Sequence, residues 1–166
     1  MAAGQSRAGS KTGGVWLTYR SSKGRLKPFS DGLHPPTENP AKPVIIDSET
    51  REYRTRFRKT NRMAVNFAGH YVVSSFGCGT GSCTSYIMTD VKTGKGSFVP
   101  FGGVAQCLPS PGEDREPLYP DVSFQAGSRL MVVSGTTFTE DDDKCLVRYY
   151  VEQNGKLKLV HSKPYK

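Results

Sequence analysis

The segment from Asn66 to Cys83 constrains the fold of this chain more than any other part of the sequence. Beyond Phe67 the side chains alternate with a period of two, which is the pattern of a β-strand. One face of this run carries His70, Val72, Ser74 and Phe76, and the other carries Tyr71, Val73 and Ser75. The run ends in Gly77-Cys-Gly-Thr-Gly-Ser-Cys83, whose glycines tolerate the positive φ angles of a tight turn. The sequence therefore predicts a strand followed by a fixed turn.

Further strands are predicted on both sides of a proline-rich loop over residues 108–120. Turn residues separate the runs, and Asn154-Gly155 is the strongest short-range hairpin signal among them. The expected strands are 84–90 and 96–101 before the loop, and 122–124, 128–134, 144–152 and 156–161 after it. The predicted fold class is mainly β (β+α) and disulfide-stapled, with one N-terminal helix. Two consecutive antiparallel β-meanders are expected, either propeller-blade-like or arranged as a sandwich.

The length of 166 residues fits one domain with a single core. Residues 1–14 are rich in Gly, Ser, Ala and Lys and are predicted to form a flexible tail, which leaves 15–166 as a single β-rich domain. Within that domain, residues 23–43 contain five prolines and are expected to run as an extended excursion over the surface.

A basic helix is predicted over residues 49–61, because Asp47 or Ser48 can cap its start. Tyr53 and Phe57 lie four residues apart, so they share one face and should pack on the domain. The remainder of the helix is basic, with Arg51, Arg54, Arg56, Arg58, Lys59 and Arg62. No base-reading motif or stacking platform accompanies these charges, so nucleic acid is not an expected partner.

Four cysteines stand at positions 78, 83, 107 and 145 and allow three pairings. We favour disulfides between Cys78 and Cys83, across the glycine-rich turn, and between Cys107 and Cys145, across a long loop. A zinc site is the alternative, but the paired short spacing of a zinc ribbon is missing around Cys107 and Cys145. Disulfides predict an oxidising compartment, and neither a metal nor another cofactor is expected.

The net charge of +8 predicts attraction to acidic partners. No apolar run reaches the length of about 18 residues that a membrane span needs, so insertion into a membrane is not expected. Residues 1–14 lack the apolar stretch of a signal peptide, and we expect the mature form of an exported protein.

Several short motifs in this chain resemble the signature of a family of small exported proteins of Gram-negative bacteria. The motifs are Asn66-Phe-Ala-Gly-His-Tyr71, Phe76-Gly-Cys-Gly-Thr-Gly81 with Cys83, Asp90-x-x-Thr-Gly94 and Ser128-Arg-Leu-Met-Val-Val133. The resemblance covers roughly residues 50–160. The family carries Trp where Phe76 stands and one residue fewer before Cys83. The resemblance implies a periplasmic protein with a disulfide-bonded β fold, and it implies no particular activity.

Three residues form the candidate catalytic set. His70 could act as an acid or base, with Cys78 as a thiol nucleophile and Asp90 as an orienting or assisting group. Against this, a cysteine five residues from another one in an exported protein is usually oxidised, and His70 then packs beside Tyr71. No serine in the chain has the context of a nucleophile elbow, so a serine hydrolase is not predicted.

The candidate binding residues are His70, Tyr71 and an acidic run, Glu140, Asp141, Asp142 and Asp143. The run lacks the alternating ligands of a calcium-binding loop and is expected at a solvated loop tip. It is the main acidic patch of a basic chain, so it could meet a basic surface of a partner.

The expected function is that of a periplasmic binding or inhibitor protein, with a protein as its partner. More specifically, we expect the immunity protein that neutralises a secreted antibacterial toxin of a type VI secretion system by binding directly to it. Small size, expected export and polar loops without a convincing catalytic set motivate this hypothesis. The alternative is an envelope-acting hydrolase that uses His70 with Asp90 or Cys78.

Overall fold

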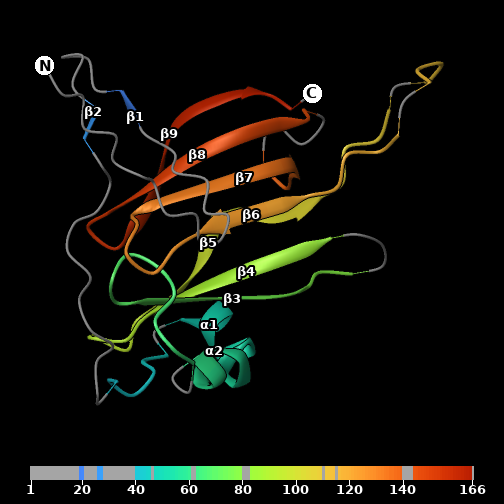
Figure 1. Cartoon of the computed structure of the whole chain (residues 1–166). Coiled ribbons are helices and arrows are strands. Elements are labelled where there is room, and N and C mark those ends of the chain that lie inside the picture. The colour runs from blue at the N-terminus through green and yellow to red at the C-terminus, as the bar shows by residue number, and fades with distance from the viewer. Residues whose placement is uncertain are drawn as a thin grey trace, which may run out of the picture.

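The chain folds mainly into antiparallel β-strands, as predicted (Figure 1). A computed structural model describes residues 19–20, 26–27, 40–45, 47–60, 63–79, 83–109, 111–114, 116–139 and 144–165. In this part of the chain the main sheet comprises β3 (Tyr71–Gly77), β4 (Thr84–Asp90), β5 (Gly96–Ala105), β6 (Asp121–Phe124), β7 (Leu130–Thr137), β8 (Leu146–Gln153) and β9 (Lys156–Pro164). A separate two-stranded sheet pairs β1 (Tyr19–Arg20) with β2 (Leu26–Lys27). The predicted tail, 1–14, and most of the excursion, 23–43, lie outside the described residues.

The two predicted meanders are present, and a short pairing joins them into one sheet of order β3-β4-β5-β7-β8-β9. β5 and β7 meet only at Val104 with Thr137 and at Ala105 with Thr136. The rest of the same edge of β7 pairs with β6, which lies off the main path. Because β6 occupies that edge, β7 cannot pair with the first half of β5.

A large bulge bends β5 in the middle. Phe98 is opposite Ile87 on β4, and Gly103 is opposite Ser85, so residues 99–102 face the single residue Tyr86. Gly102 has a φ of +66°, a backbone conformation that a glycine adopts without strain. Such an insertion bends a strand and increases its twist. The bend carries the second half of β5 toward β7 and leaves the first half apart from it.

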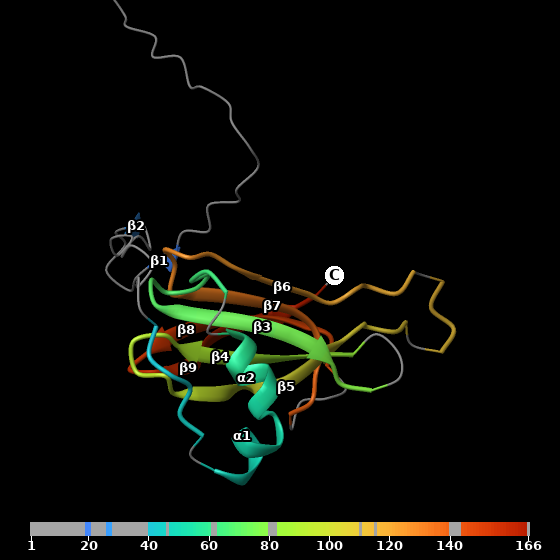
Figure 2. The same cartoon turned by 90° about the horizontal axis from the view of Figure 1, so that it is seen from below.

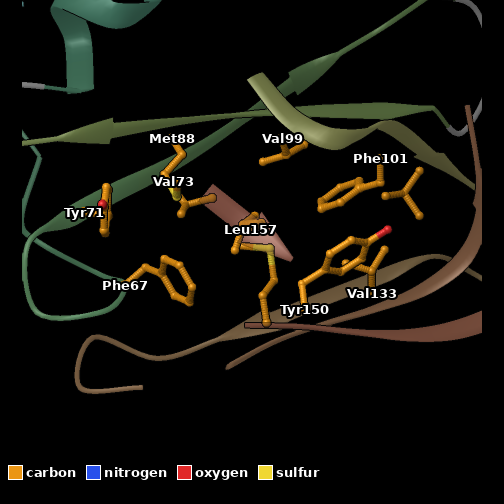
Figure 3. Close-up of a cluster of buried hydrophobic side chains, with 11 residues drawn as sticks. Phe67, Tyr71, Val73, Met88, Val99, Phe101, Val133, Tyr150 and Leu157 are labelled. Carbon is orange, nitrogen blue, oxygen red and sulfur yellow. The ribbon is translucent and has the colours of Figure 1, made fainter. Parts of the chain in front are cut away.

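One hydrophobic core lies between the two meanders (Figure 3). The rings of Phe101 on β5 and Tyr150 on β8 have centroids 5.3 Å apart, so side chains of the two meanders meet directly. The buried cluster consists of Phe67, Tyr71, Val73, Met88, Val99, Phe101, Val104, Met131, Val133, Tyr150 and Leu157. The sheet therefore wraps around its own core, in place of stacking two separate blades.

Two short helices, α1 (Ser48–Glu52) and α2 (Arg54–Thr60), replace the single helix predicted over 49–61. Asp47 caps α1 as predicted, because its carboxylate accepts from the backbone N–H of Thr50 at 2.7 Å. The change of direction at Tyr53 lets the rings of Tyr53 and Phe57 both contact Phe98, with centroids 5.0 and 6.0 Å away. The helices thus cover the outer face of the first meander (Figure 2). No helix within the described ranges is long and apolar enough to cross a membrane.

Both favoured disulfides are confirmed: Cys78 pairs with Cys83 and Cys107 pairs with Cys145, each with its Cα atoms 5.5 Å apart. Cys78 follows β3 and Cys83 precedes β4, while Cys107 follows β5 and Cys145 precedes β8. These strand ends lie at one end of the molecule, which we call the disulfide end (Figures 1 and 2). At the opposite end, the hairpin end, lie the turn before β3, the turn between β4 and β5, and the turn between β8 and β9. Two disulfides agree with the predicted oxidising environment.

Candidate functional site

A cavity of about 730 Å³ opens at the hairpin end, between β5 and the β8–β9 hairpin. Its apolar side is formed by core residues, among them Met88, Val99 and Leu157, which Figure 3 shows close together. Its lining is Tyr71, Met88, Asp90, Thr93, Lys95, Gly96, Ser97, Phe98, Val99, Pro100, Asn154, Gly155, Lys156 and Leu157. Two residues singled out from the sequence, Tyr71 and Asp90, therefore lie in one cavity.

The hydroxyl of Tyr71 belongs to a partly buried polar cluster, which we call the Glu152 cluster: Tyr71, Arg129, Glu152 and Gly155. Tyr71 donates to Glu152 Oε1 at 3.4 Å, and the backbone N–H of Gly155 donates to the same oxygen at 2.8 Å. Arg129 Nε lies 3.2 Å from Glu152 Oε2, and the Glu152 side chain is 8% exposed. The cluster fixes the β8–β9 turn against β3 and so holds one wall of the cavity in place.

The pKa of Tyr71 is raised above the ordinary tyrosine value, first because burial desolvates the phenolate and then because Glu152 and Asp90 are negatively charged nearby. Arg129 offsets a part of this effect. Tyr71 therefore stays a neutral phenol over the physiological pH range, where it can donate a hydrogen bond but cannot act as a base.

We expect Tyr71 to make the protein less stable at alkaline pH. A folded-state pKa above the unfolded value of about 10 stabilises the fold below pH 10. This stabilisation starts to fall once the pH exceeds the unfolded value of about 10, and it is lost as the pH rises through the folded-state value. The Tyr71→Phe variant should therefore lose less unfolding free energy between pH 9 and pH 11 than the parent, measured by urea denaturation. An identical pH dependence in the two proteins would contradict this assignment.

Asp90 uses its carboxylate to hold the turn between β4 and β5. One oxygen accepts from the backbone N–H of Lys92 at 2.9 Å, and the other accepts from the Thr93 hydroxyl at 2.8 Å. Gly94 follows with a φ of +73°, and its N–H donates to the Asp90 carbonyl. The Asp90-x-x-Thr-Gly94 motif is thus explained by turn formation.

His70 lies beside the cavity and does not line it. Its Nδ1 lies 3.0 Å from the carbonyl oxygen of Ala68, and its ring stacks on Tyr71 with centroids 4.2 Å apart. In the described structure no hydrogen bond joins the His70 ring to Asp90. His70 therefore helps to pack the turn before β3, and its role in binding remains a prediction.

The rest of the Asn66-Phe-Ala-Gly-His-Tyr71 motif holds the two meanders together. The Asn66 amide pairs with the backbone of Val73, accepting from its N–H at 2.8 Å and donating to its carbonyl at 2.9 Å. The N–H groups of Ala68 and Gly69 donate to Ser128 and Ala126, in the loop between β6 and β7. The motif thus occupies backbone groups of β3 that would otherwise be unpaired.

The alternative catalytic pair of His70 and Cys78 is not present in the structure. Cys78 is bonded to Cys83, so its sulfur carries no thiol. His70 precedes β3 and Cys78 follows it, which places them about 26 Å apart along an extended strand. The acidic run of Glu140, Asp141, Asp142 and Asp143 lies outside the described residues.

Two lysines of the cavity were not predicted from the sequence. Lys95 and Lys156 are exposed, and neither side chain forms an ion pair or hydrogen bond with a described residue. Each follows the glycine of a hairpin turn, in Gly94-Lys95 and Gly155-Lys156, and this repeated pair is the only sequence signal that they share. Among the described residues, no group of His, Cys, Asp or Glu could hold a metal ion.

No protein-family model, no curated protein and no solved structure matches the chain. The resemblance to exported proteins of Gram-negative bacteria therefore rests on its motif residues alone. The function has to be argued from the cavity and its surroundings.

Proposed function

We propose that the protein is a periplasmic inhibitor that binds a protein partner, and that it serves as the immunity protein for a secreted antibacterial toxin. One observation carries the proposal. In the cavity, the phenol of Tyr71 and the carboxylate of Asp90 hold the fold together, whereas an apolar surface and two lysines remain available for a partner.

The groups that hold the fold together are the Tyr71 hydroxyl and the Asp90 carboxylate. The Tyr71 hydroxyl donates to Glu152, and both carboxylate oxygens of Asp90 accept hydrogen bonds from their own turn. An apolar floor with a few polar groups around it is the composition of a binding site. Lys95 and Lys156 would attract an acidic partner and fix its orientation.

Exposed aromatic side chains at the disulfide end support a protein as the partner. Tyr119 is 72% exposed and Phe138 is 55% exposed. Phe138 packs against Gly103, which also lies close to the Cys78 sulfur. Aromatic residues are enriched in protein interfaces, and a rigid surface loses little entropy on binding.

The proposal is tested by titrating the purified protein into secreted toxins encoded beside its gene, followed by calorimetry and by assay of toxin activity. We expect binding at a stoichiometry of one to one and a proportional loss of toxin activity. The double charge reversal Lys95→Glu with Lys156→Glu should weaken binding about tenfold or more. Lys92→Glu with Lys158→Glu is the matched control, because these exposed lysines do not line the cavity. Failure to bind any neighbouring toxin would overturn the immunity function.

A further inference from the structure

The helix α2 (Arg54–Thr60) carries four exposed cations and no acidic residue. Its buried side chains, Phe57 and Thr60, face the sheet. None of the four cations forms an ion pair or a hydrogen bond with a described residue. The helix therefore presents an unpaired basic surface, which we call the α2 patch: Arg54, Arg56, Arg58 and Lys59.

Two contacts fix α2 on the sheet. The Phe57 ring packs edge-on against Phe98, with centroids 6.0 Å apart, and lies over Gly96, which has no side chain to displace it. The Thr60 hydroxyl lies 2.8 Å from the Thr89 hydroxyl on β4. These contacts hold the α2 patch on a rigid base, and a rigid surface loses little entropy on binding.

The charges of the α2 patch oppose the stability of the helix. Arg54 and Arg58 are four residues apart, and like charges at this spacing repel each other on a helix surface. Arg54 also lies in the first turn, where the helix dipole favours an acidic side chain. Residues that break such local rules are expected at functional sites. Folding therefore does not account for these cations.

The choice of arginine indicates the kind of ligand. Beyond the helices, two arginines with described side chains serve the fold: Arg129 pairs with Glu152, and Arg148 is buried and donates to the Gly135 carbonyl. The exposed cations on β9 and on the turn between β4 and β5 are lysines, at positions 92, 95, 156, 158 and 163. In the α2 patch, three of the four cations are arginines. A guanidinium binds phosphate through two parallel N–H groups, which an ammonium cannot do.

Arg56 is already oriented for such a contact. Its guanidinium carbon lies 4.2 Å from the centroid of the Phe76 ring. Contact with the face of an aromatic ring leaves the N–H groups of a guanidinium free to bind an anion. Arg54 and Arg58 lie one turn apart on the same helix, so three guanidinium groups are presented within a short distance.

The α2 patch lies on a projecting surface and not in a groove. Figure 1 shows α1 and α2 below β3, at the margin of the molecule. No residue of α2 lines the cavity at the hairpin end. α1 adds Arg51 but also Glu49 and Glu52, so the positive charge is concentrated on α2. A projecting basic surface fits a planar array of anionic groups, such as the headgroups of a membrane.

We propose that the α2 patch docks the protein on an anionic phospholipid membrane, through contacts of its arginines with headgroup phosphates. Clusters of basic side chains bind an anionic surface by adding several weak attractions. The contact is confined to the membrane surface, since Phe57, the one large apolar side chain of α2, is buried in the protein. This inference goes beyond the proposed function, because it concerns where the protein resides and not what it neutralises.

The first test mixes the purified protein with phospholipid vesicles and sediments them. Vesicles of phosphatidylglycerol and phosphatidylcholine in equal parts should carry the protein into the pellet, whereas vesicles of phosphatidylcholine alone should not. Binding should weaken as salt is added, because salt screens exposed charges. No binding to the mixed vesicles, equal binding to both kinds of vesicle, or binding that salt leaves unchanged would overturn the proposal.

The second test removes two charges from the α2 patch. The double variant Arg54→Gln with Arg58→Gln should bind the mixed vesicles at least about tenfold more weakly than the parent. Both side chains are exposed, so the fold should be unchanged. Lys92→Gln with Lys158→Gln is the matched control, because it removes the same charge from exposed positions outside α2. An equal loss in the control would mean that net charge alone governs binding, and it would overturn the proposal.

A third variant, Arg54→Lys with Arg58→Lys, keeps the charge and removes the planar fork of N–H groups. It should bind the mixed vesicles more weakly than the parent and more strongly than the glutamine variant. Binding as tight as that of the parent would overturn the proposed contacts between arginine and phosphate.

The two proposals fail in different ways. Vesicle binding without binding of any neighbouring toxin would support membrane docking and overturn the immunity function. Toxin binding without vesicle binding would leave the inhibitor function standing and overturn membrane docking. If the glutamine variant then also lost toxin binding, the α2 patch would belong to the interface with the toxin.

Discussion

Replacement of Cys107 and Cys145 by serine is expected to lower the free energy of unfolding by about 4 kcal/mol. The two cysteines are 38 residues apart, and a bond that closes a long loop removes much conformational entropy from the unfolded chain. The enclosed segment contains β6 and β7, whose pairings connect the two meanders. Loss of this disulfide should therefore loosen the link between them. Urea denaturation monitored by circular dichroism measures the effect.

The other disulfide provides a matched control. Cys78 and Cys83 are only five residues apart, so the double serine variant should lose about 2 kcal/mol. Both variants remove one disulfide from the same end of the molecule. The difference between their losses in free energy of unfolding therefore reports the effect of loop length. Equal losses, or a larger loss for Cys78 with Cys83, would contradict the entropic explanation.

Replacement of Glu152 by alanine is expected to cost about 3 kcal/mol, the second largest effect. Glu152 accepts from Gly155 N–H and from the Tyr71 hydroxyl, and both donors lose their partner when the carboxylate is removed. Arg129 also loses its ion pair, although its partial exposure lets water solvate the guanidinium. The same denaturation experiment measures this loss.

The Glu152→Gln variant separates the contribution of the charge to the free energy of unfolding from that of the hydrogen bonds. Glutamine keeps an oxygen that can accept from Gly155 and Tyr71, so its loss should be near 1 kcal/mol. Because the cluster fixes the β8–β9 turn beside the cavity, the alanine variant should also bind the partner protein more weakly, while the glutamine variant binds it nearly as the parent does. If glutamine and alanine are equally destabilising, the ion pair with Arg129 outweighs the hydrogen bonds.

Local patterns were sufficient to predict most of the strands and turns. Alternation after Phe67 predicted β3, because neighbouring side chains of a strand must face opposite sides. Asn154-Gly155 predicted the β8–β9 turn, where the two residues have φ angles of 52° and 83°. These positive values are costly for most residues and available to Asn and Gly. The short separation of Cys78 and Cys83 likewise predicted their disulfide.

The helix was predicted in its position but not in its shape. Asp47 caps it as the sequence indicated, since capping involves residues within one turn. The break at Tyr53 depends on Phe76 and Phe98, which lie far along the chain and accept the Tyr53 ring between them. A helical pattern carries no information about such distant neighbours.

The sequence by itself determined the class of fold, the main strands and the pairing of Cys78 with Cys83, because each depends on neighbouring residues or on spacing along the chain. Only the tertiary structure decided where the cavity lies. Lys95 and Lys156 are 61 positions apart in the sequence, and they line one cavity because the sheet wraps around its core. The first half of β5 does not pair with β7, because β6 occupies that edge of β7 and the bulge turns β5 away. Which strands pair depends on residues far apart in the sequence, and a local sequence pattern carries no information about them.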